Sequence, residues 1–244
     1  MTSETPLSTP LIEDFRFVAD DHQLAATRLR PGAGMVRVLT LHGLGATATR
    51  HTVRYVLDDL AAHGHGALCF EFSGNGDSTG MLEQSCLRRR CDEALAAAAQ
   101  LDAGRRPVLI GTSMGAHLAA SIVPALRPAG LVLFCPAAYP AHATDMPFDA
   151  HLPRPGRHAD SPAYAGLSDF EGDLLIIGAR NDSVVPGETL EGYLDNAPRA
   201  RSHRLIWLEG CDHFIHRWLP HQGAIKDEVL TSIRRVVSAA TLAH

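Results

Sequence analysis

The feature that most constrains the fold is an alternation of short apolar runs with segments of helical periodicity along residues 36–241. Strands that are connected through helices lie parallel, and a parallel sheet covered on both faces requires strands that are apolar throughout. The sequence therefore predicts an α/β fold. The expected strands are 36–41, 67–72, 108–110, 131–135, 174–178 and 205–208, and the expected helices are 50–63, 82–101, 116–126, 190–196 and 222–241.

Two segments fall outside this alternation. Residues 12–18 and 23–30 flank an Asp20-Asp21 turn and predict an antiparallel hairpin. Residues 136–172 are rich in Pro, His and Ala, and so long an irregular stretch is uncommon unless it is functional. We expect one domain over residues 1–244, with a short cap inserted within about 136–172.

Composition excludes several classes of protein. The chain has 244 residues and a formal net charge of -5, which disfavours a nucleic-acid partner. No apolar run approaches the roughly 20 residues that span a membrane, so we expect no membrane association. The five cysteines are odd in number and form no C-x-x-C pair. This pattern, with a polar N-terminus unlike a signal peptide, predicts a cytoplasmic protein without a disulfide framework.

The sharpest motif is Gly111-Thr112-Ser113-Met114-Gly115. It follows the predicted strand 108–110 and precedes an apolar helix, the setting in which a G-x-S-x-G turn exposes a serine hydroxyl. Serine at its ordinary pKa is a poor nucleophile and needs a base that a third group orients. Ser113 is therefore predicted to be the nucleophile, although a turn serine is the simpler alternative.

Both partners that this serine needs follow in the sequence. Asp182 comes just after strand 174–178, and His213 just after strand 205–208. The carboxyl ends of parallel strands lie at one edge of the sheet, where ligand sites form. We expect Asp182 as the orienting acid and His213 as the base. Asp173 and Asp195 are the rival acids and His216 is the rival base.

A tetrahedral oxyanion needs two N–H donors. One is expected from Met114, directly after the nucleophile, and the other from Leu44, in the loop after strand 36–41. His42 precedes a glycine turn in that loop and is expected to support it.

Five motifs in this order resemble the α/β-hydrolase family over nearly all of the chain. They are His42-Gly43-Leu44-Gly45, Phe72-Ser73-Gly74-Asn75-Gly76-Asp77-Ser78, the Ser113 turn, the Asp182 loop ending in Val185-Pro186, and Asp212-His213-Phe214. The resemblance implies an eight-stranded, mostly parallel sheet with a Ser-Asp-His triad. It is nearest to small bacterial serine carboxylesterases, including cinnamoyl and feruloyl esterases. Many members have arginine where this chain has Ser73, so the resemblance does not extend to the contact that usually anchors this loop.

Several residues are assigned to the substrate pocket. His42 and Phe214 neighbour the catalytic positions, and Cys135 ends a strand, although a buried cysteine acting as a small hydrophobe is an alternative. Arg154 and Arg157 in the cap could receive an anionic group, and a solvated charge cluster is the simpler reading. His63 and His65 lack a third ligand, so no metal is expected.

The sequence thus predicts a serine hydrolase of small or aryl carboxylic esters that needs no cofactor. Its partner would be a small-molecule acyl ester or thioester. A thioesterase or acyltransferase is the nearest alternative because the same triad serves those reactions. A serine peptidase and a non-catalytic binding protein are more distant alternatives, and the oligomeric state stays open.

Overall fold

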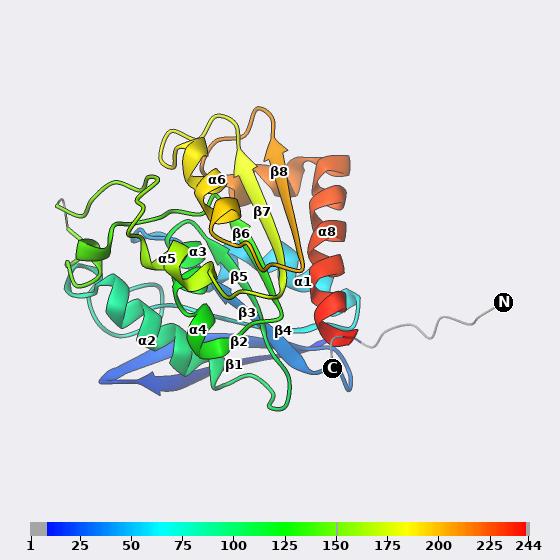
Figure 1. The fold of residues 1–244 in the computed structure, drawn as a ribbon. Coiled ribbons are helices and arrows are strands. Elements are labelled where there is room, and N and C mark those ends of the chain that lie inside the picture. Colours follow the sequence, from blue (N-terminus) through cyan, green and yellow to red (C-terminus); the bar gives the residue numbers. More distant parts are fainter. Residues whose placement is uncertain (1–8, 150, 243–244) are drawn as a thin grey trace.

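A computed structural model describes residues 9–149 and 151–242, with side chains placed to Ala240. Its eight strands form one sheet in the order β1-β2-β4-β3-β5-β6-β7-β8 (Figure 1). The strands are β1 (Leu11–Ala19), β2 (His22–Arg30), β3 (Val36–Leu41), β4 (Gly66–Phe70), β5 (Val108–Thr112), β6 (Gly130–Phe134), β7 (Asp173–Ala179) and β8 (Ser202–Leu208). Strands β4, β3 and β5 to β8 are parallel, and β2 joins β4 antiparallel. The predicted fold class is confirmed.

The opening hairpin is also confirmed. β1 and β2 pair antiparallel over their whole length, and the turn between them places Asp20 at a φ of 51°. Aspartate tolerates this left-handed backbone better than most residues. The hairpin extends the sheet at the edge opposite β8.

Successive residues of the central strands supply two separate cores. In β6, Leu131 and Leu133 pack into one apolar cluster, whereas Val132 and Phe134 pack into the other. This is the period of two that a strand buried on both faces requires. The first cluster lies under α2 (Leu87–Ala98), α3 (Met114–Ser121), α5 (Pro162–Leu167) and α6 (Gly187–Asp195). The second lies under α1 (Arg54–Ala62) and α8 (Gly223–Leu242).

Two predicted helices are interrupted. Predicted helix 116–126 is divided into α3 and α4 (Val123–Leu126), because Pro124 has no N–H to continue the hydrogen bonds of α3. Predicted helix 82–101 begins as the 3₁₀ turn η2 (Leu82–Gln84) and resumes as α2 after extended backbone at Ser85 and Cys86. The Ser85 carbonyl accepts the N–H of Phe148, which joins this break to the region proposed as a cap.

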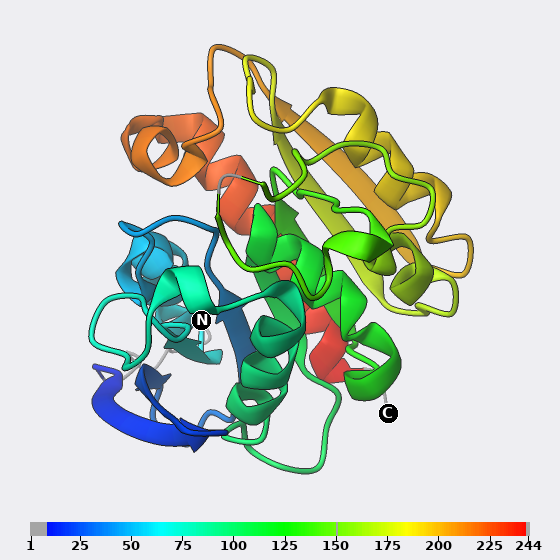
Figure 2. The same ribbon diagram turned by 90° about the vertical axis from the view of Figure 1, so that its left-hand side faces the viewer.

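Residues 136–172 contain a 3₁₀ turn, η3 (Ala141–Ala143), and helix α5. Gly166 of α5 lies so close to α3 that a Cβ would stand 2.2 Å from the Ala120 carbonyl oxygen. Helix α5 therefore belongs to the layer of helices over the sheet (Figure 2). Only the stretch before α5 is left to act as a cap, and that role stays a prediction. Among the described residues, no helix is long and apolar enough to cross a membrane.

Candidate active site

The turn between β5 and α3 holds Ser113 in a strained conformation. Its φ of 52° and ψ of −113° lie in a region that L residues rarely occupy. The positions on either side must be glycine, because a Cβ atom there would collide with neighbouring backbone. A Cβ on Gly111 would stand 2.5 Å from the Ala116 Cα, and one on Gly115 would stand 2.1 Å from the Leu41 carbonyl oxygen. The resulting strand–turn–helix is the geometry in which a G-x-S-x-G serine is presented for nucleophilic attack.

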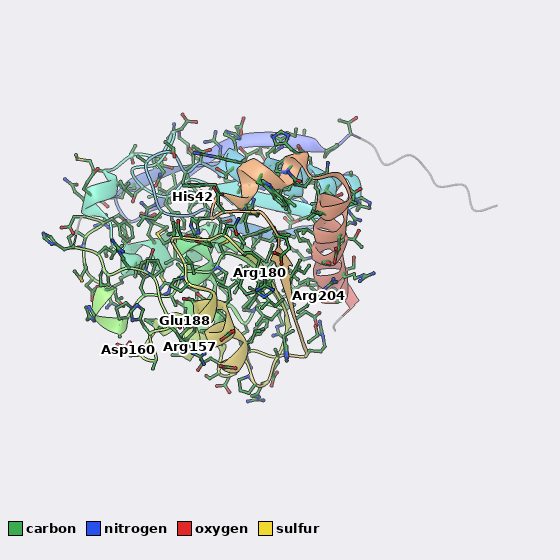
Figure 3. All side chains as sticks on the ribbon, turned by 90° about the horizontal axis from the view of Figure 1, so that it is seen from above. His42, Arg157, Asp160, Arg180, Glu188 and Arg204 are labelled. Carbon is green, nitrogen blue, oxygen red and sulfur yellow. The ribbon has the colours of Figure 1, made fainter. Side chains whose placement is uncertain are left out.

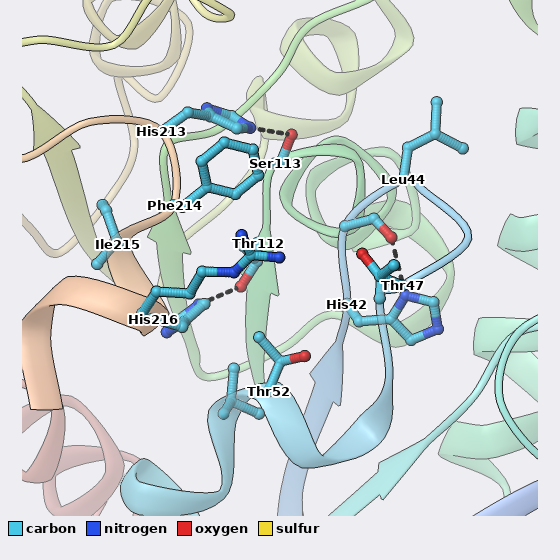
Figure 4. Close-up of a pocket in the computed structure, with 14 residues that line it drawn as sticks. His42, Leu44, Thr47, Thr52, Thr112, Ser113, His213, Phe214, Ile215 and His216 are labelled. Carbon is cyan, nitrogen blue, oxygen red and sulfur yellow. Dashed lines mark hydrogen bonds between the residues drawn. The ribbon is translucent and has the colours of Figure 1, made fainter.

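The structure brings Ser113, His213 and Asp182 together, and we call these three residues the candidate triad. His213 Nε2 lies 3.1 Å from Ser113 Oγ (Figure 4). His213 Nδ1 lies 2.8 Å from Asp182 Oδ2. Since Asp182 can only accept when ionised, His213 donates from Nδ1–H and offers Nε2 to the serine hydroxyl. The three residues therefore have the contacts of a nucleophile, its base and an orienting acid.

The charge of Asp182 is stabilised although the residue is buried. Burial alone would raise its pKa, but hydrogen bonds from His213, from the Val185 N–H and from the Cys135 thiol outweigh burial and lower it. Its second oxygen, Oδ1, accepts the N–H groups of Val184 and Val185 at 2.8 Å each. The acid thus stays ionised and fixed in orientation.

Cys135 lies directly behind this acid. Its thiol donates to Asp182, and burial together with the carboxylate raises the pKa of the thiol far above its ordinary value. Cys135, Asp182 and His213 have ligand atoms within 4.8 Å of one another. A metal would need a thiolate and would have to break the bond between Asp182 and His213. The residues fit a protonated thiol that supports the acid better than a metal centre.

The oxyanion loop, residues 42–48, runs against Ser113 from the end of β3. A Cβ on Gly43 would lie 3.5 Å from that of Ser113. Leu44 is in this loop and Met114 is the first residue of α3, so the Met114 N–H has no partner within the helix. Both predicted oxyanion donors therefore flank Ser113, and their use in catalysis stays a prediction.

His42 holds the start of this loop. The Phe72 N–H donates to its Nε2 at 3.1 Å, so the ring carries its proton on Nδ1 and donates it to the Gly43 carbonyl at 2.8 Å. Burial lowers the pKa of His42 to about 3, and burial lowers those of His117 and His216 to about 3 as well. We call these three the buried histidines, and all of them are neutral at pH 7.

Asn75 holds the other end of the oxyanion loop, and sequence reasoning did not assign it a role. Its amide nitrogen donates to the carbonyls of Gly45 and Ala48, at 2.8 and 3.1 Å. Its amide oxygen accepts Nη2 of Arg90 at 3.2 Å, which fixes the amide orientation. Arg90 is fully buried and stacks over Phe72 at 4.8 Å. A guanidinium from α2 therefore holds the Asn75 side chain in place.

The burial of Arg90 could have been predicted from the spacing of residues in α2. Leu87, Arg90, Ala94 and Ala97 follow one another at helical spacing and are all buried on one face of α2. Glu93 is buried on the same helix and lies 4.0 Å from the Arg90 guanidinium, so the spacing of three residues already indicates one buried partner. The second partner, Asn75, lies fifteen residues earlier in a loop, and its position cannot be predicted from the helical pattern.

A pocket of about 310 Å³ opens beside Ser113. One wall is the oxyanion loop with Thr52 and Val53, and the other runs from His213 to Arg217 (Figure 4). The predicted substrate residues His42 and Phe214 line it. His216, the rival base, also lines it, but its Nε2 lies 2.8 Å from Thr112 Oγ1 and its Nδ1 lies 3.0 Å from the Tyr55 hydroxyl. These contacts differ from those that a base for Ser113 needs.

The other predicted substrate residues do not line this pocket. Cys135 is buried behind Asp182. Arg154 is exposed, and Arg157 pairs with Asp195 and Glu191 of α6. Figure 3 shows Arg157 beside α6 and well separated from His42. The ion pairs of Arg157 therefore agree with the simpler interpretation, a solvated charge cluster.

The model of the α/β-hydrolase family matches residues 38–229, which include every residue of the candidate triad. The chain belongs to the α/β-hydrolase family. A search of curated protein sequences gives no significant match.

Solved structures share the fold at low identity. Est1E from Butyrivibrio proteoclasticus, with ferulic acid bound, has a TM-score of 0.69 and 15% identity, covering 92% of this chain and 99% of its own. A serine hydrolase without a lid from Xanthomonas campestris gives 0.65 and 18%, covering 95% and 97%. A thioesterase domain from the curacin biosynthetic pathway gives 0.67 and 15%, covering 91% and 99%. At such identities these likenesses establish the fold alone.

Proposed function

We propose that this chain hydrolyses carboxylic esters of small or aryl acyl groups, with Ser113 as nucleophile. The observation that carries the proposal is the continuous contact from Asp182 through His213 to Ser113 Oγ, at 2.8 and 3.1 Å. The strained turn at Ser113 and the adjoining pocket are further support.

The reaction follows from these contacts. His213 Nε2 takes the Ser113 proton as the hydroxyl attacks the acyl carbon, and Asp182 stabilises the imidazolium that forms. The N–H groups of Leu44 and Met114 hold the oxyanion. His213 then protonates the departing alcohol, and the acyl-enzyme remains. Water activated by the same base releases the acid and restores the serine.

The pocket limits the acyl group. A volume of about 310 Å³ suits a short acyl chain or an aryl ring better than a long lipid chain. The fold shared with Est1E, which binds ferulic acid in its structure, favours an aryl acid among these. Turnover of p-nitrophenyl esters should therefore be highest for short chains, and a maximum at long acyl chains would count against this pocket as the acyl site.

A panel of matched esters, thioesters and amides tests the reaction. We expect ester turnover that falls by about 10⁴-fold or more in Ser113→Ala, with an unchanged thermal midpoint. A fluorophosphonate should label Ser113 in the wild type. Full ester turnover by Ser113→Ala would refute the mechanism. Failure to label would favour a binding protein without catalysis.

A thioesterase is the second candidate, since a thioesterase domain shares this fold over 91% of the chain. Acyl transfer would use the same acyl-enzyme with another acceptor than water. Thioester turnover that exceeds that of the matched oxygen ester would favour this candidate.

A further inference from the structure

The pocket beside Ser113 has an unusual charge for this protein. The chain carries a formal net charge of -5, yet no aspartate or glutamate is found among the described residues that line the pocket. Two of its histidines, His42 and His216, are neutral because burial lowers their pKa values to about 3. The guanidinium of Arg217 is therefore the permanent charge of the pocket lining.

Arg217 also differs from most arginines of the protein in its partners. Arg88, Arg201 and Arg234, for example, each pair with a carboxylate. Arg217 is exposed and forms no ion pair within the described part of the chain. Its guanidinium carbon instead lies 4.8 Å over the Phe214 ring. Stacking of this kind orients the guanidinium and leaves its N–H edges available to a ligand.

The stacked pair places this charge close to the reacting groups. The Phe214 ring meets the His213 ring edge to face, with 6.0 Å between their centroids. Arg217 is thus separated from the candidate base by one aromatic ring. Asp212 lines a neighbouring surface groove together with Arg217. Its carboxylate accepts the Phe214 N–H at 2.9 Å, and it forms no ion pair with Arg217 in the described structure.

The other exposed residues that line the pocket, Leu44, Thr47, Thr52 and Phe214, are uncharged. Leu44 and Phe214 are large hydrophobic residues, and each comes from a loop that carries a predicted catalytic residue or donor. Leu44 and Phe214 flank Ser113 in Figure 4. Exposed apolar side chains beside one unpaired cation fit a substrate with an apolar body and an anionic end.

We propose that Arg217 selects substrates that carry a carboxylate several bonds away from the reacting carbonyl. This inference rests on the proposed function and adds the substrate class. The carboxylate could belong to the acyl group or to the leaving alcohol, and two substrate pairs distinguish these sources. One pair is monophenyl adipate and its terminal carboxamide. The other is 4-carboxyphenyl butyrate and 4-carbamoylphenyl butyrate.

The measurement is the ratio of kcat/KM for the anionic member to that for the neutral member. A charge-assisted hydrogen bond in a half-open site should make this ratio about ten in the wild type for one of the pairs. Arg217→Gln should bring it close to one, mainly through a higher KM, because the charge binds the ground state and the transition state alike. Arg217→Lys should keep part of the preference, and raised salt should weaken it.

Two control variants remove the same charge elsewhere. Arg235→Gln changes an exposed arginine on α8, far from the pocket lining, and should leave the ratio unchanged. Arg154→Gln tests the cap instead. A ratio that falls with Arg154→Gln and not with Arg217→Gln would move the anion site to the cap and overturn the proposal, as would a wild-type ratio of one for both pairs.

Binding to Ser113→Ala separates this proposal from that of ester hydrolysis. Calorimetry on this variant should show tighter binding of the anionic members, and the difference should disappear in Ser113→Ala/Arg217→Gln. If the wild type hydrolyses none of the esters but this contrast is found, the anion site stands and ester hydrolysis fails. If esters are hydrolysed and the contrast is absent, the anion site fails alone.

Discussion

Gly115→Ala tests how closely the helix after the nucleophile must approach the sheet. The added Cβ would stand 2.1 Å from the Leu41 carbonyl oxygen and 2.6 Å from that of His42. An ordinary contact needs well over 3 Å, so α3 or the end of β3 must move by about 1 Å or more. Both groups are backbone, one in the last residue of β3 and the other in the first residue of the oxyanion loop, and neither can rotate away as a side chain would.

The expected cost lies at the upper end of the range for overpacking. Alanine favours a helix over glycine by about 1 kcal/mol, but overpacking costs about 1–3 kcal/mol and more when the backbone must shift. We expect a net loss of about 3 kcal/mol, which corresponds to a thermal midpoint about 6–12 °C lower in a chain of this length. The same movement displaces the oxyanion loop that follows His42, and kcat should fall by about 100-fold.

Differential scanning fluorimetry and ester kinetics check both effects. Gly187→Ala is a matched control, since Gly187 begins α6 and its Cβ would meet only the edge of the Trp207 ring at 3.3 Å. We expect this control to change the midpoint by at most about 2 °C. A Gly115→Ala protein with both a wild-type midpoint and a wild-type kcat would refute the claim that this contact sets the position of the turn.

Three further predictions concern the site and its support. Asp182→Asn removes the carboxylate that holds His213 as the Nδ1–H tautomer. We expect kcat to fall by about 10³–10⁴-fold at a similar thermal midpoint. Unchanged kinetics would contradict the role proposed for Asp182. Asn75→Ala removes two hydrogen bonds to the oxyanion loop and should lower kcat by about 10–100-fold, while a fluorophosphonate still labels Ser113. Gly156→Ala is the control variant, and an equal loss of esterase activity in it would indicate a general effect. The buried histidines have pKa values lowered from 6.5 to about 3, so below pH 6.5 the unfolded chain binds protons that the folded chain does not. The free energy of unfolding should therefore fall between pH 6.5 and 3, by about 1.4 kcal/mol per pH unit for each histidine, and His117→Gln should reduce the slope of urea midpoints by about a third; a midpoint independent of pH would contradict it.

The fold could be predicted because its determinants are local and repeated. Strands β4 and β6 carry no polar side chain and β7 is apolar after Asp173, and the residues between strands have helical periodicity. The positions of Ser113, Asp182 and His213 followed from topology, because parallel strands bring their carboxyl ends to one edge. The interruption of helix 116–126 was also present in the sequence, at Pro124, but the periodic apolar pattern continues across it.

The substrate side of the site could not be predicted in this way. Arg154 and Arg157 drew attention because they lie close together in an irregular segment, whereas the pocket formed between the oxyanion loop and residues 213–217. Which loops enclose a pocket depends on how they pack, and periodicity carries no information on that. The hydrogen bond from Arg90 to Asn75 could not be predicted from periodicity either, since it joins a helix face to a loop through side chains alone.

The order of the candidate triad along the chain has a consequence for synthesis. Ser113 precedes the proposed base by 100 residues, and His213 follows β8, which among the described strands pairs with β7 alone. A ribosome that adds about 5–20 residues each second completes the serine turn several seconds before the base exists. Throughout that interval the hydroxyl has no group to take its proton and is no more reactive than an ordinary serine. Under the proposed mechanism, reactivity requires that β8 dock and bring His213 to Ser113, so a nascent or stalled chain should be inert toward esters.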